Sequence, residues 1–340
     1  MPENISVIIC CYNSSSRITN TLQSILQQIP KLSFDVEVIV VDNNSNDDTA
    51  EKVGQLFKQY PETSTKLVSE QTPGLSHARH AGINATSHPT LCFVDDDNEI
   101  LEGYFELVAN MFSIHPNLGI LGGHGLPAKD LNAPTWFSSV QENFAVGPQS
   151  PEPNKLVKVD AVYGAGFSIR KRILDQLKDA GFASILTGRK GKKLSSGEDT
   201  ELCWAVKMAG FDIGYHSHLK FIHHIPVERV NWSYVKKLNF GFGQSKVIID
   251  IYQNVFQNTI PKLNSKLPYW FDRYLYLRKA NKHFNKVNST KDEPGNLDQL
   301  RHLGQKGEMK KLIELRSSIP KLYAQVEQFY ATIKQNPGDK

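Results

Sequence analysis

The stretch LCFVDDDNEI, Leu91 to Ile100, joins an apolar run to three consecutive aspartates. The four apolar residues at its start are typical of a β-strand that is buried on both faces of a sheet. Three adjacent carboxylates repel one another, so we expect a positive group to neutralise them. The stretch therefore predicts a buried strand that ends in an acidic site, and the rest of the chain must indicate what that site binds.

Further apolar runs precede this strand. They are ISVIICCY at residues 5–12, VEVIVV at residues 36–41 and the shorter TKLVSE at residues 65–70. Segments with helical spacing of apolar side chains lie between the runs, and this alternation is typical of a mainly parallel sheet covered by helices. In such sheets ligands bind beyond the carboxyl ends of the strands. The polar residues at those ends are Tyr12, Asn13, Asp42, Asn43 and Asp95 to Asn98.

The composition limits the expected partners and location. A formal net charge of +4 over 340 residues is too small to indicate nucleic acid as a partner. The four cysteines lack metal-ligand spacing and are expected to be reduced, buried thiols. No signal peptide is visible, and no apolar stretch approaches about 18 residues. We therefore expect a cytoplasmic protein without a transmembrane helix.

EDTELCWAVKMAG at residues 198–210 predicts a helix in the second half of the chain. Gly210 at its end is a typical helix C-cap. Glu198 and Asp199 open the helix, where the helix dipole favours acidic side chains. The acidic pair therefore has a structural explanation, and a catalytic role needs further support.

DIGYHSHLKFIHH at residues 212–224 predicts a strand. Because successive residues of a strand face opposite sides, only one of the adjacent His223 and His224 is expected to face a site. The residues that follow are helical, aromatic and basic in character. LPYWFDRYLYLRKANK at residues 267–282 mixes aromatic and cationic residues, which suits either a helix packed on the protein or a helix at a membrane surface.

The three aspartates allow three interpretations. They could belong to a solvated loop that caps the next helix. They could open a calcium-binding loop, but Ile100 stands where such a loop needs glycine, and a strand precedes it in place of a helix. They could also bind a Mg²⁺ or Mn²⁺ ion that carries a diphosphate, because such cations combine few carboxylates with phosphate oxygens. Asp95 and Asp97, as alternate residues at a strand end, are the natural pair for that ion.

These segments, in this order, resemble the family 2 glycosyltransferases of GT-A fold from about Ile5 to Pro226. The segments that carry the resemblance are VIICCYN, EVIVVDNNSNDDT, TPGLSHARHAGI, FVDDDN, GAGFSIRKRI, GEDTELCWAVKMAG and YHSHLKFIHH. FVDDDN fits the DxD pattern of that family, with Asp95 and Asp97 at its ends. Each segment alone is a weak signal, but seven in the right order and spacing are a strong one.

The resemblance implies an α/β fold with a mainly parallel central sheet covered by helices. Residues 1–226 would form the GT-A domain, with a nucleotide-binding half at about 1–125 and an acceptor half at 126–226. Residues 227–340 would form a mostly helical C-terminal extension. Lipid-linked acceptors are common in the family, so peripheral contact with the inner face of the cell membrane is an expectation for this extension.

The resemblance also implies roles for individual residues. The nucleotide-binding residues would be Tyr12, Asn13, Asp42, Arg79 and Asp95. The ligands of a divalent cation, Mn²⁺ or Mg²⁺, would be Asp97, Asp95 and His223. Asp199 would be the general base for an acceptor hydroxyl, with Glu198 in support. The structural alternatives are a turn residue for Asp42, a core residue for Tyr12, a surface residue for Arg79 and a buried histidine for His223.

The implied reaction is the metal-dependent, inverting transfer of a sugar from a nucleotide-sugar donor to a hydroxyl of a glycan or lipid-linked acceptor. UDP-sugars are the commonest donors in the family, and bacterial cell-surface polysaccharide synthesis is the expected setting. Two other classes stay open. A non-catalytic sugar-nucleotide or glycan-binding module could lack Asp97 or Asp199, and both are present. A metal-dependent nucleotidyltransferase would more often carry a glycine-rich phosphate loop where this chain has CCYNSSSR.

Overall fold

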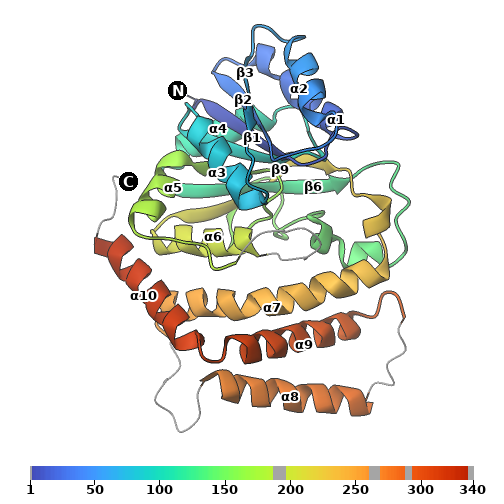
Figure 1. The fold of residues 1–340 in the computed structure, drawn as a ribbon, viewed down its shortest axis with the longest axis vertical. Coiled ribbons are helices and arrows are strands. Elements are labelled where there is room, and N and C mark those ends of the chain that lie inside the picture. The colour runs from blue at the N-terminus through green and yellow to red at the C-terminus, as the bar shows by residue number, and fades with distance from the viewer. Residues whose placement is uncertain (1, 187–196, 260–268, 288–292, 336–340) are drawn as a thin grey trace.

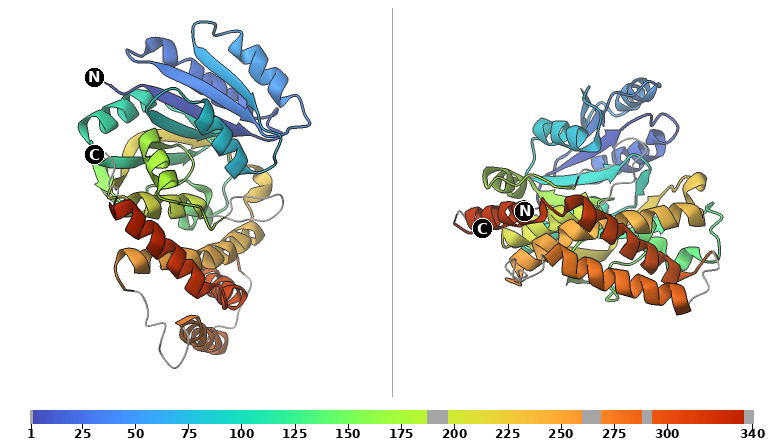
Figure 2. Two further views of the ribbon diagram at one scale, coloured as in Figure 1. Left: turned by 60° about the vertical axis from the view of Figure 1, so that its left-hand side comes forward. Right: turned by 60° about the horizontal axis from the view of Figure 1, so that its bottom comes forward.

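The computed structural model describes residues 2–186, 197–259, 269–287 and 293–335. Within these ranges a mixed sheet runs in the order β3–β2–β1–β4–β8–β6–β9–β5, with β7 paired to β9. Helices cover the sheet, and the long C-terminal helices lie below it in Figure 1 and in the turned views of Figure 2. The expected α/β fold, with a helical C-terminal extension, is confirmed.

The first four strands are parallel and arise from the apolar runs of the sequence. Their bounds are β1 Ile5–Cys11, β2 Val36–Asp42, β3 Ser64–Ser69 and β4 Thr90–Asp95. The connecting helices are α1 Ile18–Leu26, α2 Thr49–Phe57 and α3 Leu75–Ala85. β1 lies between β2 and β4, with Ile5 opposite Val36 on one side and Thr90 on the other. This register brings the carboxyl ends of all three strands to one edge.

The central strands contribute to two hydrophobic cores, one on each face of the sheet. Along β4, Leu91 and Phe93 pack into one core, whereas Cys92 and Val94 pack into the other. Because side chains alternate between the faces, a strand covered on both sides has no position that suits a polar residue. This explains why the runs are continuously apolar until the strand ends.

The sheet changes direction at β8, Phe167–Arg170, which pairs antiparallel with β4. The other strands of this half are β5 Asn98–Ile100, β6 Leu118–Pro127, β7 Leu156–Lys158 and β9 Asp212–His223. Its helices are α4 Tyr104–Ile114, α5 Lys171–Asp179 and α6 Glu198–Met208. The short 3₁₀ turns are Ile29–Lys31, Phe137–Ser139, Gln141–Phe144 and Val227–Arg229.

β6 is a long strand that the apolar pattern does not predict, because its sequence LGILGGHGLP is interrupted by glycines. Glycine weakens a strand in isolation. Here it makes room for neighbours: a Cβ on Gly122 would lie 2.4 Å from Val162, and one on Gly123 would lie 2.3 Å from the Leu219 carbonyl oxygen. Tertiary packing therefore requires glycines in β6, although glycine has a low intrinsic preference for strands.

The C-terminal helices share a core with the sheet domain. Their bounds are α7 Trp232–Phe256, α8 Tyr269–Val287, α9 Leu297–Leu315 and α10 Ile319–Gln335. Tyr252 of α7 and Tyr323 of α10 belong to the same hydrophobic cluster as Trp204 of α6. The core is thus continuous across the boundary expected at residue 226, and that boundary stays a prediction.

Residues 269–282 of the aromatic and basic stretch 267–282 lie in α8, and residues 267 and 268 lie outside the described residues. Leu277 is buried, and Arg273 Nε donates to Glu308 Oε1 of α9 at 2.6 Å, while Tyr276 is exposed. One face of α8 is therefore packed on the protein, as one of the two alternatives predicts. Among the described helices, none is long and apolar enough to cross a membrane.

Gly243→Ala is expected to destabilise the protein, because the new methyl group would lie 1.8 Å from the Gly304 carbonyl oxygen and force α7 away from α9. Overpacking costs about 1–3 kcal/mol, which exceeds the ~1 kcal/mol that Ala gains over Gly in a helix. Gly54→Ala in α2 is the matched control, because nothing lies within 4 Å of its added Cβ. Thermal unfolding should show a lower melting temperature only for Gly243→Ala. Equal melting temperatures for the two variants would contradict the close α7–α9 contact.

Candidate active site

The polar residues at the ends of β1, β2 and β4 gather at one edge of the sheet. Cys11 pairs with Asp42, and Cys10 pairs with Asp95. The next residue along β1, Tyr12, has 55% of its surface exposed at this edge. The alternative of a core tyrosine is therefore wrong, and the ring is accessible to a ligand.

Asn13 and Asp42 both stabilise turns at this edge. Asn13 has a φ of 49°, in the left-handed region, and its Oδ1 accepts the Asn46 N–H at 2.9 Å. Asp42 Oδ1 accepts the Ser45 N–H at 3.2 Å, which orients the carboxylate at the end of β2. The turn role considered for Asp42 is thus present, and its contact with a nucleotide base stays a prediction.

Asp97 and His223 lie side by side because β5 pairs with β9. Asn98, which follows Asp97, is opposite His223 in this antiparallel pair. Asp97 Oδ1 lies 3.6 Å from His223 Nε2, and both side chains are largely buried. His224 instead contacts Glu99, with 2.7 Å between Nε2 and Oε1. The adjacent histidines therefore have different acidic neighbours, and His223 is the one beside the acidic turn.

The His223 ring is oriented as metal-binding histidines usually are. Its Nδ1 lies 2.7 Å from the Phe144 carbonyl oxygen, which can only accept, so Nδ1 carries a proton. In the neutral ring, Nε2 then presents its lone pair toward Asp97. Burial lowers the pKa of His223, but the Asp97 carboxylate outweighs burial and the net shift of this pKa is upward.

The burial of these carboxylates favours a cation beside them. Burial raises the pKa of Asp95, and the charge of Asp97 raises it further. Burial acts on Asp97 too, but His223 outweighs it, and the pKa of Asp97 is lowered. The part of the chain that the structure describes holds no group of three or more His, Cys, Asp or Glu residues that could bind a metal alone. Two protein ligands nevertheless fit Mg²⁺ or Mn²⁺, because such ions commonly complete their shell with phosphate oxygens and water.

Arg79, on α3, contacts the acidic pair at the start of α6. Its Nη1 lies 3.2 Å from Asp199 Oδ1 and 3.9 Å from Glu198 Oε1. Burial lowers the pKa of Arg79, but Asp199 and Asp95 are the main groups that outweigh it, and the pKa is raised. Only 20% of the Arg79 side chain is exposed, so the surface alternative is wrong. The guanidinium contacts the start of α6, and its contact with a diphosphate stays a prediction.

Asp199 lies against a glycine of the segment GAGFSIRKRI. A Cβ on Gly164 would come within 2.1 Å of Asp199 Oδ2, so a larger residue there would displace the carboxylate. The Asp199 side chain is 30% exposed and stands in the first turn of α6. The geometry therefore provides an accessible carboxylate at the start of α6.

Glu201 is a buried acid that holds the start of α6 in place. Its carboxylate accepts hydrogen bonds from the Ile185 N–H at 2.8 Å, from the Leu186 N–H at 2.9 Å and from the Tyr252 hydroxyl at 2.9 Å. Burial raises the pKa of Glu201 despite these bonds. A Cβ on Gly197, the N-cap of α6, would lie 3.2 Å from Leu186, so the two segments touch.

A contact between Asp96, Arg17 and Ser14 was missed at the level of sequence. Asp96 Oδ2 accepts a hydrogen bond from Arg17 Nη2 at 2.7 Å and another from Ser14 Oγ. The sequence pattern assigns Asp95 and Asp97 to a cation, but it assigns no partner to Asp96. The available signal was the arginine of NSSSR, because this segment follows β1, the neighbour of β4.

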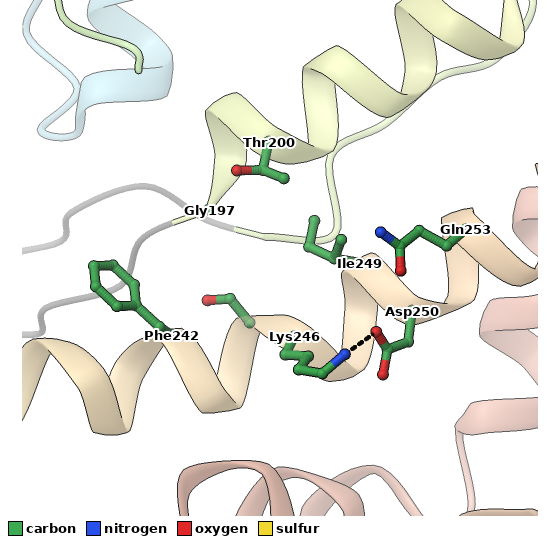
Figure 3. Close-up of a pocket in the computed structure, with 8 residues that line it drawn as sticks. Gly197, Thr200, Phe242, Lys246, Ile249, Asp250 and Gln253 are labelled. Carbon is green, nitrogen blue, oxygen red and sulfur yellow. Dashed lines mark hydrogen bonds and ion pairs between the residues drawn. The ribbon is translucent and has the colours of Figure 1, made fainter. Parts of the chain in front are cut away.

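A cavity of about 300 Å³ lies between the start of α6 and α7 (Figure 3). Its lining residues are Gly197, Thr200, Phe242, Ser245, Lys246, Ile249, Asp250 and Gln253. Lys246 donates to Asp250, and Phe242 is 37% exposed. The cavity thus combines one aromatic ring with hydroxyl, amide and charged groups, next to the turn that carries the acidic pair. This lining suits a hydroxyl-rich ligand.

Solved structures of similar fold are glycosyltransferases. S. aureus TarS in complex with UDP-GlcNAc has a TM-score of 0.52 at 17% identity, covering 98% of this chain and 91% of TarS 1-349. GalNAc-T7 with UDP, GalNAc and Mn²⁺ has a TM-score of 0.53 at 15% identity, covering 94% of this chain and 58% of the other. The architecture is therefore that of the GT-A glycosyltransferases.

The family described as glycosyl transferase family 2 matches residues 6–178, which is half of the chain. This chain belongs to that family. A glucosyl-dolichyl phosphate glucuronosyltransferase of Haloferax volcanii is 20% identical over 251 residues, which are 73% of this chain and 77% of that protein. A poly-beta-1,6-N-acetyl-D-glucosamine synthase of Staphylococcus epidermidis is 21% identical over 250 residues, which are 73% of this chain and 56% of the synthase. Glycosyltransferase GlyA of Streptococcus pneumoniae is 24% identical over 191 residues, which are 52% of this chain and only 26% of GlyA.

Proposed function

We propose that this chain is a metal-dependent, inverting glycosyltransferase that moves a sugar from a nucleotide-sugar donor to an acceptor hydroxyl. One observation carries the proposal: Arg79 contacts Asp199 at 3.2 Å, and the charge of Asp95, at the end of β4, also acts on Arg79 and helps to raise its pKa. A diphosphate bound at the acidic turn would place its sugar near a carboxylate that can take a proton. Glycosyl transfer needs this pairing of a leaving-group site with a base.

The donor would lie along the ends of β1, β2 and β4. Tyr12 would line the base pocket with its exposed ring, Asp42 would accept a hydrogen bond from the base, and Asn13 and Asp95 would contact the nucleoside. UDP-GlcNAc is bound in the TarS structure and UDP in the GalNAc-T7 structure, which supports a UDP-sugar as the donor. Arg79 would pair with phosphate oxygens through its guanidinium fork.

Asp97 and His223 would hold the divalent cation, with Asp95 beside them. The cation would supply positive charge that stabilises the departing diphosphate. The proton on His223 Nδ1 is held by the Phe144 carbonyl, which keeps Nε2 available as a ligand. The chain's own part in this step is therefore to orient the two ligands.

Asp199 would act as the general base. It would take the proton of the acceptor hydroxyl while that oxygen bonds to the anomeric carbon and the bond from this carbon to the diphosphate breaks. A single displacement from the opposite face inverts the configuration. Arg79 contacts both Asp199 and Glu198, so Glu198 would support the base by sharing Arg79.

The acceptor would be a glycan or a lipid-linked glycan that reaches the cavity beside α6. The names of the relatives, one of them a polysaccharide synthase, support bacterial cell-surface polysaccharide synthesis as the setting. Family membership disfavours a nucleotidyltransferase. A non-catalytic module is disfavoured because Asp97 and Asp199 are both present and both placed near Arg79 or His223.

A thermal-shift screen of nucleoside diphosphates and sugar nucleotides with Mn²⁺ tests the proposed function directly. A ligand that binds the native state raises the melting temperature with its concentration. We expect UDP or a UDP-sugar to give the largest rise, and EDTA to reduce it. A screen in which no nucleotide raises the melting temperature would rule the function out.

Asp97→Asn should abolish the part of nucleotide affinity that depends on the cation. Glu99→Gln is the matched control, because Glu99 stands two residues away but contacts His224. Calorimetric titration with UDP should show tighter binding in Mn²⁺ than in EDTA for the wild type and the control, and no difference for Asp97→Asn. Equal wild-type affinities in Mn²⁺ and EDTA would remove the metal from the mechanism.

Asp199→Asn should keep donor binding and lose transfer by a factor of about 10²–10⁴, the usual contribution of a general base. Asn preserves the size of the side chain and is tolerated at helix starts, so a purely structural role would survive the substitution. The measurement is UDP release from the donor found in the screen, with UDP affinity as the control. Turnover near the wild-type value would exclude Asp199 as the base.

A further inference from the structure

The middle aspartate of the acidic turn already has a cation from the protein itself. Asp96 Oδ2 lies 2.7 Å from Arg17 Nη2, and the Ser14 hydroxyl donates to the same oxygen. The Asp96 side chain is 14% exposed, so these contacts form in a mostly buried setting. Asp96 is therefore engaged inside the protein, whereas Asp97 lies beside His223.

Both partners of Asp96 also hold the backbone of the turn after β1. Arg17 donates through Nη1 to the Asn13 carbonyl at 3.0 Å and through Nη2 to the Tyr12 carbonyl at 3.2 Å. Ser14 Oγ accepts the Tyr12 N–H at 3.1 Å. Asn13 itself has a φ of 49°, in the left-handed region, which asparagine adopts more readily than most residues. One carboxylate thus restrains, through two side chains, the turn that carries the exposed Tyr12 ring.

The same turn is joined on its other side to the turn after β2. The Asn13 N–H donates to Ser45 Oγ at 2.9 Å, and the Ser45 N–H donates to Asp42 Oδ1 at 3.2 Å. The ends of β1, β2 and β4 therefore form one hydrogen-bonded unit. Within it, Asp96 connects the acidic turn to the two turns that would contact the nucleoside.

We propose that Asp96 is a positioning residue: through Arg17 and Ser14 it fixes the turn after β1 relative to the cation ligands. The inference rests on the proposed function and deepens it. A nucleoside diphosphate that contacts both the turn after β1 and the bound cation must span a fixed distance from its base to its phosphates. A turn that is already held at this distance loses less conformational entropy when the nucleotide binds than a loose turn would. The nucleotide therefore binds more tightly.

This role differs from a contribution to stability. The Asp96 carboxylate is mostly buried, so loss of the link is also expected to lower the melting temperature, which does not distinguish the two roles. In a folded variant, loss of the link should weaken nucleotide binding while the cation requirement stays near its wild-type value. A cation ligand or a purely structural residue would not produce this combination.

The test compares Asp96→Asn, Arg17→Lys and the double variant with the wild type, using the full chain. Lysine keeps a positive charge near Asp96 but cannot reach the carboxylate and two carbonyls at once. Glu102→Gln is the control, because it removes the exposed pair with Lys31 and leaves the turn alone. The probes are UDP titrated by calorimetry with Mn²⁺ present, and Mn²⁺ titrated at saturating UDP and followed by electron paramagnetic resonance.

We expect each single variant to raise the Kd for UDP about tenfold, as for loss of a charged hydrogen bond. The double variant should bind no more weakly than the singles, because all three lose the same link. The Mn²⁺ concentration for half-saturation should not change, and Glu102→Gln should match the wild type.

A wild-type Kd in Arg17→Lys would overturn the proposal, because charge alone would then suffice. A higher Mn²⁺ requirement in Asp96→Asn would also overturn it, because Asp96 would then be a cation ligand. If Asp96→Asn fails to fold, Ser14→Ala takes its place, and an unchanged Kd there is equally contrary. Failure of the wild type to bind UDP or any other nucleoside diphosphate would instead refute the proposed function, and the inference with it.

Discussion

Three negative charges in a row, mostly shielded from water, must be compensated, and the arrangement of the elements around the end of β4 follows from that requirement. Clustered carboxylates are costly to bury unless positive groups lie beside them. The fold supplies one partner for each from three separate elements: Arg17 for Asp96, His223 for Asp97 and the charge of Arg79 for Asp95. The start of α1, the end of β9 and the middle of α3 are thereby drawn to one point, and the two halves of the sheet meet there.

α6 is held in place in a different way, by a buried carboxylate that accepts hydrogen bonds from neutral donors. Glu201 accepts hydrogen bonds from two backbone N–H groups and the Tyr252 hydroxyl, and it brings no cation into the core. Below it, α7 and α10 continue the core of the sheet domain. The C-terminal helices therefore support the helix that carries Asp199, in addition to any role at a membrane surface.

Much of the parallel part of the sheet could be predicted, because its strands are apolar on both faces and end in polar turns. β1, β2 and β4 lie where the runs indicate. β6 could not be predicted, since its glycines are explained only by Val162 and Leu219, which are distant in sequence. The pairing of Asp97 with His223 was accessible through family resemblance. The partner of Asp96 was not, because the register of β1 against β4 decides it.

The contact between Leu186 and Gly197 has a consequence for how this fold can diversify. The chain leaves the described fold at Leu186, which Glu201 holds, and returns at Gly197, which touches Leu186 and opens α6. Because these two points are close together and Glu201 holds the first of them, the start of α6 is fixed by contacts within the described residues. Substitutions between the two points can therefore alter the chemistry offered to an acceptor without moving the first turn of α6, which carries Asp199.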